Sequence, residues 1–181
     1  MTPDFSHAFT LAAEPDGARR VFAYARQGLL QSVDALLVTA SVYDVPNMRS
    51  RRVWTDDATA YPTGNFKLLE RNEYFETVIE GRQPFSSTTI EGMAKVFFDH
   101  EKIKALGFES NLNLPAIAEG KVIGTINLLH RKGHYTAERV AEAMAWQPIA
   151  TLAFLLLDRE GSDTASFHDS ATTVANGVVE G

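Results

Sequence analysis

The chain has no cysteine among its 181 residues. Without a thiol it forms no disulfide, no thiolate nucleophile, no thiolate metal ligand and no cysteine-held iron–sulfur cluster. It also lacks an excess of basic residues, because 17 Lys and Arg stand against 23 Asp and Glu and the net charge is −6. Binding to phosphates needs clustered basic residues, so we expect no nucleic-acid partner.

Long apolar runs are missing as well. The longest, IATLAFLLL at 149–157, is too short to span a bilayer, and the N-terminus has neither the basic start nor the apolar core of a signal peptide. We therefore expect a cytoplasmic protein with no membrane partner. A composition of 45% hydrophobic and 22% charged residues fits one globular domain with its own core.

The first half of the chain predicts a helix followed by a hairpin. Apolar residues recur at helical spacing over 17–33 behind Asp16, a candidate N-cap. Two stretches rich in β-branched or alternating residues, 34–45 and 49–55, flank a turn at Pro46 and predict paired strands. A loop over 56–67 and short helices up to Gly107 follow.

The last helix is predicted over 137–157, but Pro148 lies inside it. An interior proline removes a hydrogen bond, so we expect either a kink at 145–147 or two helices in sequence. Beyond it the chain has few large apolar residues. We therefore divide the chain into an N-terminal arm (1–16), a domain (17–158) and a weakly packed C-terminal tail (159–181).

The segment 110–130, SNLNLPAIAEGKVIGTINLLH, is the most informative part of the sequence. Two apolar runs of strand length are joined by a Glu-Gly-Lys turn. Beyond the first residue they carry four uncharged polar side chains, and a buried polar group destabilises the fold unless it is hydrogen-bonded. These side chains need either neighbours in the fold or a ligand, and they are Asn111, Asn113, Thr125 and Asn127.

The register of this hairpin decides whether those side chains share a face. A three-residue loop at 119–121 pairs Asn113 with Asn127, Pro115 with Thr125, and Ala118 with Val122, which gives a polar stripe. A two-residue loop shifts the register by one and separates Asn113 from Asn127. We favour the first register; ordinary core polar groups bonded to the backbone remain the alternative for the stripe.

The element order predicts an α+β fold with an antiparallel sheet. The run LGFESNLNLPAIAEGKVIGTINLLH, with the YPTGNFK loop and the FFDHEKIKALG helix before it, resembles GAF domains over roughly 20–157. It is most similar to the short single-domain GAF proteins of bacteria. The resemblance implies terminal helices on one face of the sheet and a loop- and helix-covered pocket on the other. It also implies a stand-alone small-molecule sensor or carrier, and a homodimer formed through 17–33 and 137–157.

Several GAF subclasses do not fit the sequence. The lack of cysteine separates it from the free methionine sulfoxide reductases and from the bilin-attaching domains of phytochromes. The Asn-Lys-Phe-Asp-Glu pattern of cyclic-nucleotide-binding GAF domains is absent too. No resident cofactor is expected. A haem would need a histidine in the pocket, and we do not expect one.

The resemblance and the polar stripe together select candidate ligand-binding residues. Aromatic walls with a few amides suit a small planar or carboxylated ligand. For each aromatic residue, a place in the ordinary core is the alternative. Arg49, Arg51 and Arg52 could pair with a carboxylate or form a solvated strand edge. The candidates are Trp54, Tyr61, Thr63, Phe66, Phe85, Thr89, Asn111, Asn113, Thr125 and Asn127.

Two alternatives to a binding protein stay open. An enzyme could use the same pocket with His130 or His100 as general acid or base. A structural dimeric module with a collapsed cavity is the other alternative. We expect no metal site, because the His130–His134 pair falls in a loop containing Gly133, where i and i+4 side chains do not share a helical face.

Overall fold

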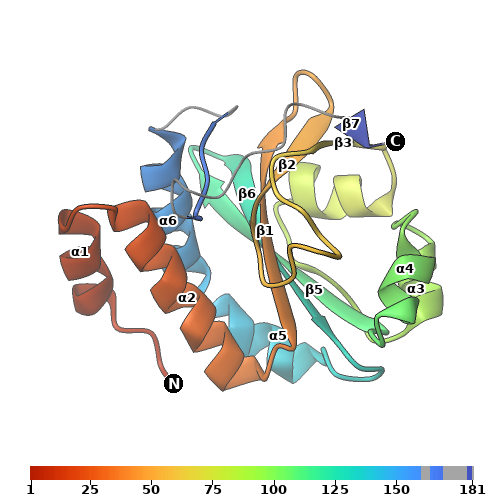
Figure 1. Ribbon diagram of the computed structural model, residues 1–181. Coiled ribbons are helices and arrows are strands. Elements are labelled where there is room, and N and C mark those ends of the chain that lie inside the picture. The colour runs from red at the N-terminus through yellow and green to blue at the C-terminus, as the bar shows by residue number, and fades with distance from the viewer. Residues whose placement is uncertain (160–163, 169–178, 181) are drawn as a thin grey trace.

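The computed structural model describes residues 1–159, 164–168 and 179–180. Within these residues, one seven-stranded sheet has the order β4-β5-β6-β1-β2-β3-β7 (Figure 1). Neighbouring strands are antiparallel, except that β7 pairs in parallel with β3. The predicted α+β fold with an antiparallel sheet is thus confirmed. The strands are β1 Leu37–Asp44, β2 Arg49–Thr55, β3 Phe66–Leu68, β4 Phe85–Ser87, β5 Ser110–Ala118, β6 Lys121–His130 and β7 Val179–Glu180.

One face of the sheet is covered by the terminal helices, as expected (Figure 1). The main core lies between them and the sheet. It contains Phe22 and Leu29 from the inner side of α2, Trp146, and Phe154 from α6, all buried against apolar strand residues. Burial of this apolar surface is the main term that stabilises the fold. The helices of this layer are α1 Phe5–Ala13, α2 Gly17–Val33, α5 Ala137–Met144 and α6 Gln147–Asp158.

The chain breaks between α5 and α6 near the predicted position. The axes of the two helices are bent by 50°, and Pro148 lies in the first turn of α6, where its missing N–H costs no helical hydrogen bond. In the part of the chain described, no single helix is long and apolar enough to cross a membrane, although α5 and α6 taken together across their bend have such a length and composition.

Short elements and loops cover the opposite face of the sheet. They include a π-helix, η1 Phe75–Glu80, and two short helices, α3 Ile90–Ala94 and α4 His100–Ala105. The short helices predicted before Gly107 are thus present, and α3 has only five residues. Beyond Ala94 the chain turns so that Phe97 packs against Tyr74 and Phe85.

The hairpin register is correct along the polar stripe, but the turn is not as predicted. Asn113 pairs with Asn127 and Pro115 with Thr125, whereas Ala118 pairs with Lys121 instead of Val122. The loop is therefore two residues long, and both of its residues have positive φ, as a type I′ turn requires. A β-bulge beyond Ala116 absorbs the extra residue, which is why the stripe survives the shorter loop.

The terminal segments pack more closely than the sequence suggests. In the proposed arm, 1–16, helix α1 lies against α2. In the proposed tail, Ala165 and Phe167 are buried, which differs from the expected weak packing. The Phe167 ring stacks on Phe22 at 4.1 Å between centroids and meets Phe154 at 5.2 Å, so aromatic contacts hold this segment against the helical layer. Residues 160–163, 169–178 and 181 of that tail lie outside the described residues.

Candidate functional site

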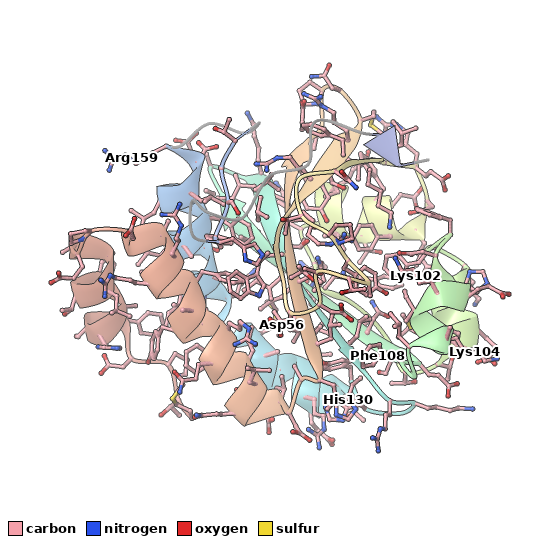
Figure 2. The ribbon with its side chains drawn as sticks, in the orientation of Figure 1. Asp56, Lys102, Lys104, Phe108, His130 and Arg159 are labelled. Carbon is pink, nitrogen blue, oxygen red and sulfur yellow. The ribbon has the colours of Figure 1, made fainter. Side chains whose placement is uncertain are left out.

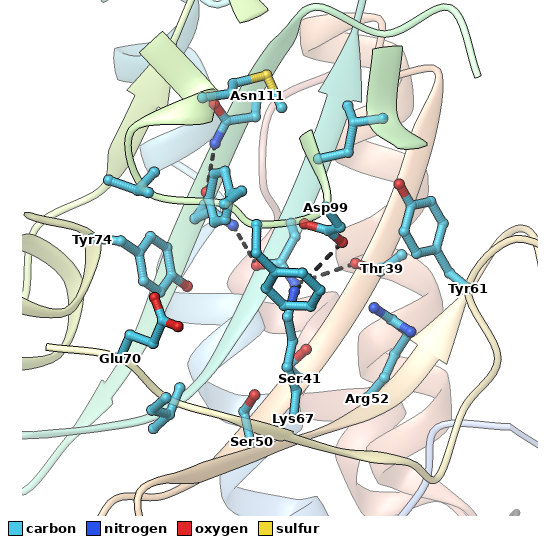
Figure 3. A pocket seen from close by; sticks show the side chains of 18 of the residues that line it. Thr39, Ser41, Ser50, Arg52, Tyr61, Lys67, Glu70, Tyr74, Asp99 and Asn111 are labelled. Atoms are coloured by element: carbon cyan, nitrogen blue, oxygen red, sulfur yellow. Dashed lines mark hydrogen bonds and ion pairs between the residues drawn. The ribbon is translucent and has the colours of Figure 1, made fainter. Parts of the chain in front are cut away.

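A cavity of about 150 Å³ lies between the sheet and the elements that cover its second face (Figure 3). Its floor is formed by side chains of β1, β2, β5 and β6, and its cover by the segment after β3, by α3 and by the chain around α4. The polar and charged residues that line it are Thr39, Ser41, Tyr43, Ser50, Arg52, Tyr61, Lys67, Glu70, Asn72, Tyr74, Asp99, Asn111, Asn113 and Asn127.

Three asparagine amides and one threonine hydroxyl form a hydrogen-bonded row across the floor. We call Asn111, Asn113, Asn127 and Thr39 the amide row. Asn111 Nδ2 donates to Asn113 Oδ1 at 2.7 Å, and Asn113 Nδ2 donates to Asn127 Oδ1 at 2.8 Å. Asn127 Nδ2 donates to Thr39 Oγ1 at 3.2 Å. The row depends on register, because Asn113, Asn127 and Thr39 are direct partners across three neighbouring strands. One end of it stays open: Asn111 Oδ1 is buried with no hydrogen-bond partner among the described residues.

Two tyrosines form one side of the cavity. The hydroxyls of Tyr43 and Tyr74 lie 2.6 Å apart, and the Tyr43 hydroxyl also lies 3.0 Å from Thr125 Oγ1. Burial raises the pKa of Tyr43 and raises that of Tyr74 well above its usual range. Both phenols therefore keep their protons at neutral pH and act as hydrogen-bond donors and acceptors.

Charged side chains occupy the other side. Lys67 Nζ lies 3.5 Å from Asp99 Oδ2, and the Arg52 guanidinium lies 5.0 Å from the centroid of the Tyr61 ring. Figure 3 shows Tyr61 and Arg52 across the cavity from Tyr74. Burial, followed by the nearby Asp99 charge, raises the pKa of Tyr61 to about 12. The cavity therefore combines apolar walls with neutral and ionised polar groups.

Comparison with known proteins identifies the fold. No protein-family model matches the sequence, and neither does any curated protein. Solved structures do match. The GAF domain of a two-component sensor histidine kinase from Bacillus halodurans has a TM-score of 0.63 at 12% identity, over 78% of this chain and 95% of that one.

Two further structures agree. The GAF domain of a phosphoenolpyruvate-protein phosphotransferase from Coxiella burnetii has a TM-score of 0.62 at 17% identity, over 83% of this chain and 89% of that one. A GAF domain/HD domain protein from Geobacter sulfurreducens has a TM-score of 0.61 at 12% identity, over 84% and 96%. This chain has the GAF-domain fold. At sequence identities this low, the similarity shows that this chain shares the fold of those proteins but does not show that it shares their function.

Four of the ten residues predicted to bind a ligand line the cavity of this GAF fold: Tyr61, Asn111, Asn113 and Asn127. Thr125 is fully buried behind the lining, where its hydroxyl contacts Tyr43. Phe85 lies behind it too, packed against Tyr74 and Phe97. These two positions support the wall rather than form it.

The other four predicted residues have different surroundings. Trp54 packs on the helical face of the sheet, stacked on His168 at 4.3 Å and next to Phe22 at 5.2 Å. Phe66 lies under the Arg49 guanidinium, 4.1 Å from its centre. Thr89 caps α3 by accepting the Gly92 N–H. Thr63 is not among the lining residues.

Arg49, Arg51 and Arg52 have different surroundings in the structure. Arg52 lines the cavity and donates to the Pro62 carbonyl at 3.0 Å. Arg51 points to the opposite face and is 2% exposed, so the solvated-edge interpretation is wrong for it. Arg49 pairs with Asp44 at 2.8 Å. Alternation along β2 explains why neighbouring arginines lie on different faces.

Several further lining residues follow a pattern that is visible in the sequence, although they are not among the ten predicted residues. Thr39, Ser41 and Tyr43 alternate with apolar residues along β1, and Ser50 and Arg52 alternate along β2. This period of two places them on the cavity face. The charged residues Lys67, on strand β3, and Asp99, before helix α4, come from different elements, and no sequence pattern indicates that they meet.

Neither candidate catalytic histidine lines the cavity. The His100 ring Nδ1 is 3.0 Å from the Phe97 carbonyl oxygen. His130 lies at the edge of the molecule in Figure 2, at the end of β6. Its ring stacks on His134 with centroids 3.3 Å apart, and neither of its nitrogens has a hydrogen-bond partner among the described residues.

The surroundings of His130 predict a pH dependence of stability. Burial, then the charges of His134, Arg139 and Arg131, lower its pKa, and only Asp34 opposes this change. The unfolded chain therefore binds a proton at this position more readily than the folded chain. The contribution of neutral His130 to the free energy of unfolding is complete above pH ~6.5, the pKa in the unfolded chain. It is lost as the pH falls from there through the lowered pKa of the folded chain.

We expect His130→Asn to reduce the loss of stability between about pH 7.5 and pH 5.5, because asparagine does not titrate. Urea unfolding of both proteins at each pH measures the change. An equal slope of unfolding free energy against pH in the two proteins would show that His130 does not contribute.

Proposed function

We propose that this protein is a GAF-fold sensor or carrier that binds a small molecule in the cavity on the second face of its sheet. The observation that carries the proposal is the amide row, which spans three strands and ends in the unpartnered Asn111 Oδ1. A buried acceptor without a partner costs about 1–3 kcal/mol. A ligand that donates to it would remove that cost.

The size and lining of the cavity support binding over a purely structural module. About 150 Å³ is roughly ten times what a single buried water needs. A few placed polar groups within aromatic and aliphatic walls are typical of ligand pockets. The enzyme alternative has less support, because His100 and His130 lie outside the lining and a general base must reach the proton that it removes.

Native mass spectrometry of freshly purified protein, followed by a thermal-shift screen, tests the proposal. The screen would contain carboxylates, purines, small aromatic molecules and haem. A co-purifying mass, or a rise in melting temperature of several degrees with one class, is expected, because a ligand that binds only the native state stabilises it. No bound mass and no shift with any class would favour the structural module.

The homodimer is a second part of the proposal, with its interface on α1 and α6. Three large apolar side chains are exposed there: Phe5 by 48%, Phe9 by 64% and Leu155 by 46%. Phe5 and Phe9 are four residues apart and share one side of α1, and α1 contacts α6. Helix α1 covers part of α2, the segment 17–33 that the sequence predicts for the interface. We therefore propose α1 in place of α2 as the N-terminal part of the interface.

Phe9→Glu should weaken the dimer at least about tenfold, because burying a phenylalanine contributes about 1.5–3 kcal/mol and a buried carboxylate is unfavourable. Sedimentation equilibrium of both proteins measures the change. Leu106→Glu is the matched control, since Leu106 is 38% exposed but lies next to α4 on the other side of the sheet. A wild-type chain that is monomeric at all concentrations contradicts the prediction.

A further inference from the structure

The cavity presents two buried carbonyl or carboxylate oxygens that no described group satisfies, Asn111 Oδ1 and Asp99 Oδ1. Asn111 is only 2% exposed. Both residues line the cavity. Each oxygen is a hydrogen-bond acceptor, so a molecule that fills the cavity gains most by donating to them.

Asp99 is placed in an unusual way. It occupies the N-cap position of α4, where an aspartate normally accepts a backbone N–H from the first turn, but its side chain makes no such bond. Its Oδ2 faces Lys67 Nζ at 3.5 Å, and Figure 3 shows the carboxylate among the lining side chains. The Asp99 carboxylate therefore does not cap the helix and lines the cavity instead.

The cations of the cavity are already engaged by protein groups. Lys67 faces Asp99 and also lies 4.4 Å from the centroid of the Phe98 ring. Arg52 donates to the Pro62 carbonyl and lies over the Tyr61 ring. A second carboxylate, Glu70, lines the same space. An anionic ligand would therefore meet two carboxylates and compete with the bonds that these cations make.

The two ends of the cavity differ in which hydrogen-bonding groups of a ligand they can bind. Rotating the three amides of the amide row by half a turn, with the Thr39 hydroxyl as donor, would present Asn111 Nδ2 in place of Oδ1. That end can therefore bind a donor or an acceptor. A carboxylate at neutral pH only accepts, so the Asp99 end sets the character of the ligand.

We propose that the ligand is neutral or cationic, donates an N–H to Asp99 Oδ1 at one end and hydrogen-bonds the Asn111 amide at the other. This inference rests on the proposed function. A cavity of about 150 Å³ holds a molecule of benzene size, so the part of the ligand inside it is about one six-membered ring. Amines, amides and amidines on such a ring are the chemical class that fits.

Benzamidine, benzamide and benzoate test the proposal, because they share a ring and differ in donors and charge. Binding is followed by nitrogen-15 NMR of the asparagine side-chain amides. Benzamidine and benzamide should shift the Asn111 and Asn113 signals, and benzoate should bind at least about tenfold more weakly than benzamidine, which corresponds to one charge-assisted hydrogen bond. Benzoate that binds as tightly as benzamidine overturns the inference and leaves the binding function standing.

Asp99→Asn locates the donor contact. It should weaken benzamidine at least about tenfold and benzamide less, because the amide keeps an acceptor and loses the charge. Glu142→Gln makes the same chemical change on the exposed surface of α5 and should alter neither. Equal losses in the two variants overturn the inference. If Asp99→Asn does not fold, the order of the three probes on the wild-type chain decides alone.

Failure of the inference can be told from failure of the proposed function. If none of the three probes moves the asparagine signals at millimolar concentration, the ligand is not of this class and the inference is overturned. The proposed function fails only if the ligand screen also finds no bound mass and no thermal shift.

Discussion

Replacing Asn113 with leucine should lower the free energy of unfolding by about 2–6 kcal/mol. Asn113 is the middle of the amide row, where it accepts from Asn111 at 2.7 Å and donates to Asn127 at 2.8 Å. Its removal leaves the donor of buried Asn111 and the acceptor of partly buried Asn127 without these partners, and a buried polar group without a partner costs about 1–3 kcal/mol. Urea unfolding followed by tryptophan fluorescence measures the loss.

Asn47→Leu is the matched control, because Asn47 also makes side-chain hydrogen bonds, to Asp44, but is exposed at the β1–β2 turn. Water replaces those bonds, so the control should cost less than about 1 kcal/mol. A loss in Asn113→Leu no larger than in this control would contradict the importance of the row.

Replacing all three asparagines of the row with leucine should restore most of the lost stability. When both partners of a buried hydrogen bond become apolar, the exchange is close to neutral, and only the Thr39 hydroxyl, which accepts from Asn127, loses its partner in the row. The same variant should bind no ligand in the cavity. A triple variant that is stable but does not bind would show that the row is kept for recognition, whereas one as unstable as Asn113→Leu would mean that the fold needs the row.

The polar stripe could be predicted from the sequence because a strand has a simple period of two. Asn111 and Asn113 share a face by that period alone, and any register that pairs Asn113 with Asn127 brings the stripe together. The loop was the uncertain part. The bulge after Ala116 corrects for the shorter turn, and short-range turn preferences do not indicate where a bulge will fall.

Trp54 shows how one irregularity changes a prediction. By alternation it belongs on the cavity face with Arg52. The register of β2 against β1 shifts there, however: Ala40 pairs with Trp54 and Ser41 with Arg52, so Val53 has no partner on β1. Beyond this bulge Trp54 packs on the helical face beside Phe22, although the regular alternation places it on the other.

The charged side of the cavity could not be predicted from local patterns. Lys67 on strand β3 and Asp99 at the start of α4 are separated by 32 residues, and they meet only because α4 lies over this face of the sheet. Their contact depends on tertiary packing, for which a single sequence contains no periodic signal. The fold and the floor of the site therefore follow from the sequence, and the cover of the site follows from the structure.

Trp146→Ala should lower the free energy of unfolding by about 3–5 kcal/mol. Trp146 is fully buried between α5 and α6, where its Nε1 donates to Ser32 Oγ at 3.0 Å and its ring meets Tyr24 edge-on at 5.3 Å. Alanine would leave a cavity in the helical layer and remove the hydrogen bond to Ser32 Oγ, which keeps its own bond to the Gly28 carbonyl. Denaturant unfolding measures the loss, and Trp54→Ala, which removes a partly exposed indole, should cost less.

Gly28 on α2 lies directly against the Trp146 ring, and variants at both positions test this one contact. A Cβ at Gly28 would lie 2.2 Å from atoms of that ring, so Gly28→Val alone forces the indole out of place and should also destabilise the protein. Combined with Trp146→Ala, the valine occupies part of the vacated space. The double variant should therefore lose less than the sum of the two single changes, by about 0.5–3 kcal/mol. Strict additivity would mean that the two positions do not share this space.

Because Trp146 lies across the sheet from the ligand cavity, folded Trp146→Ala should retain ligand affinity, which separates loss of the core from loss of the site.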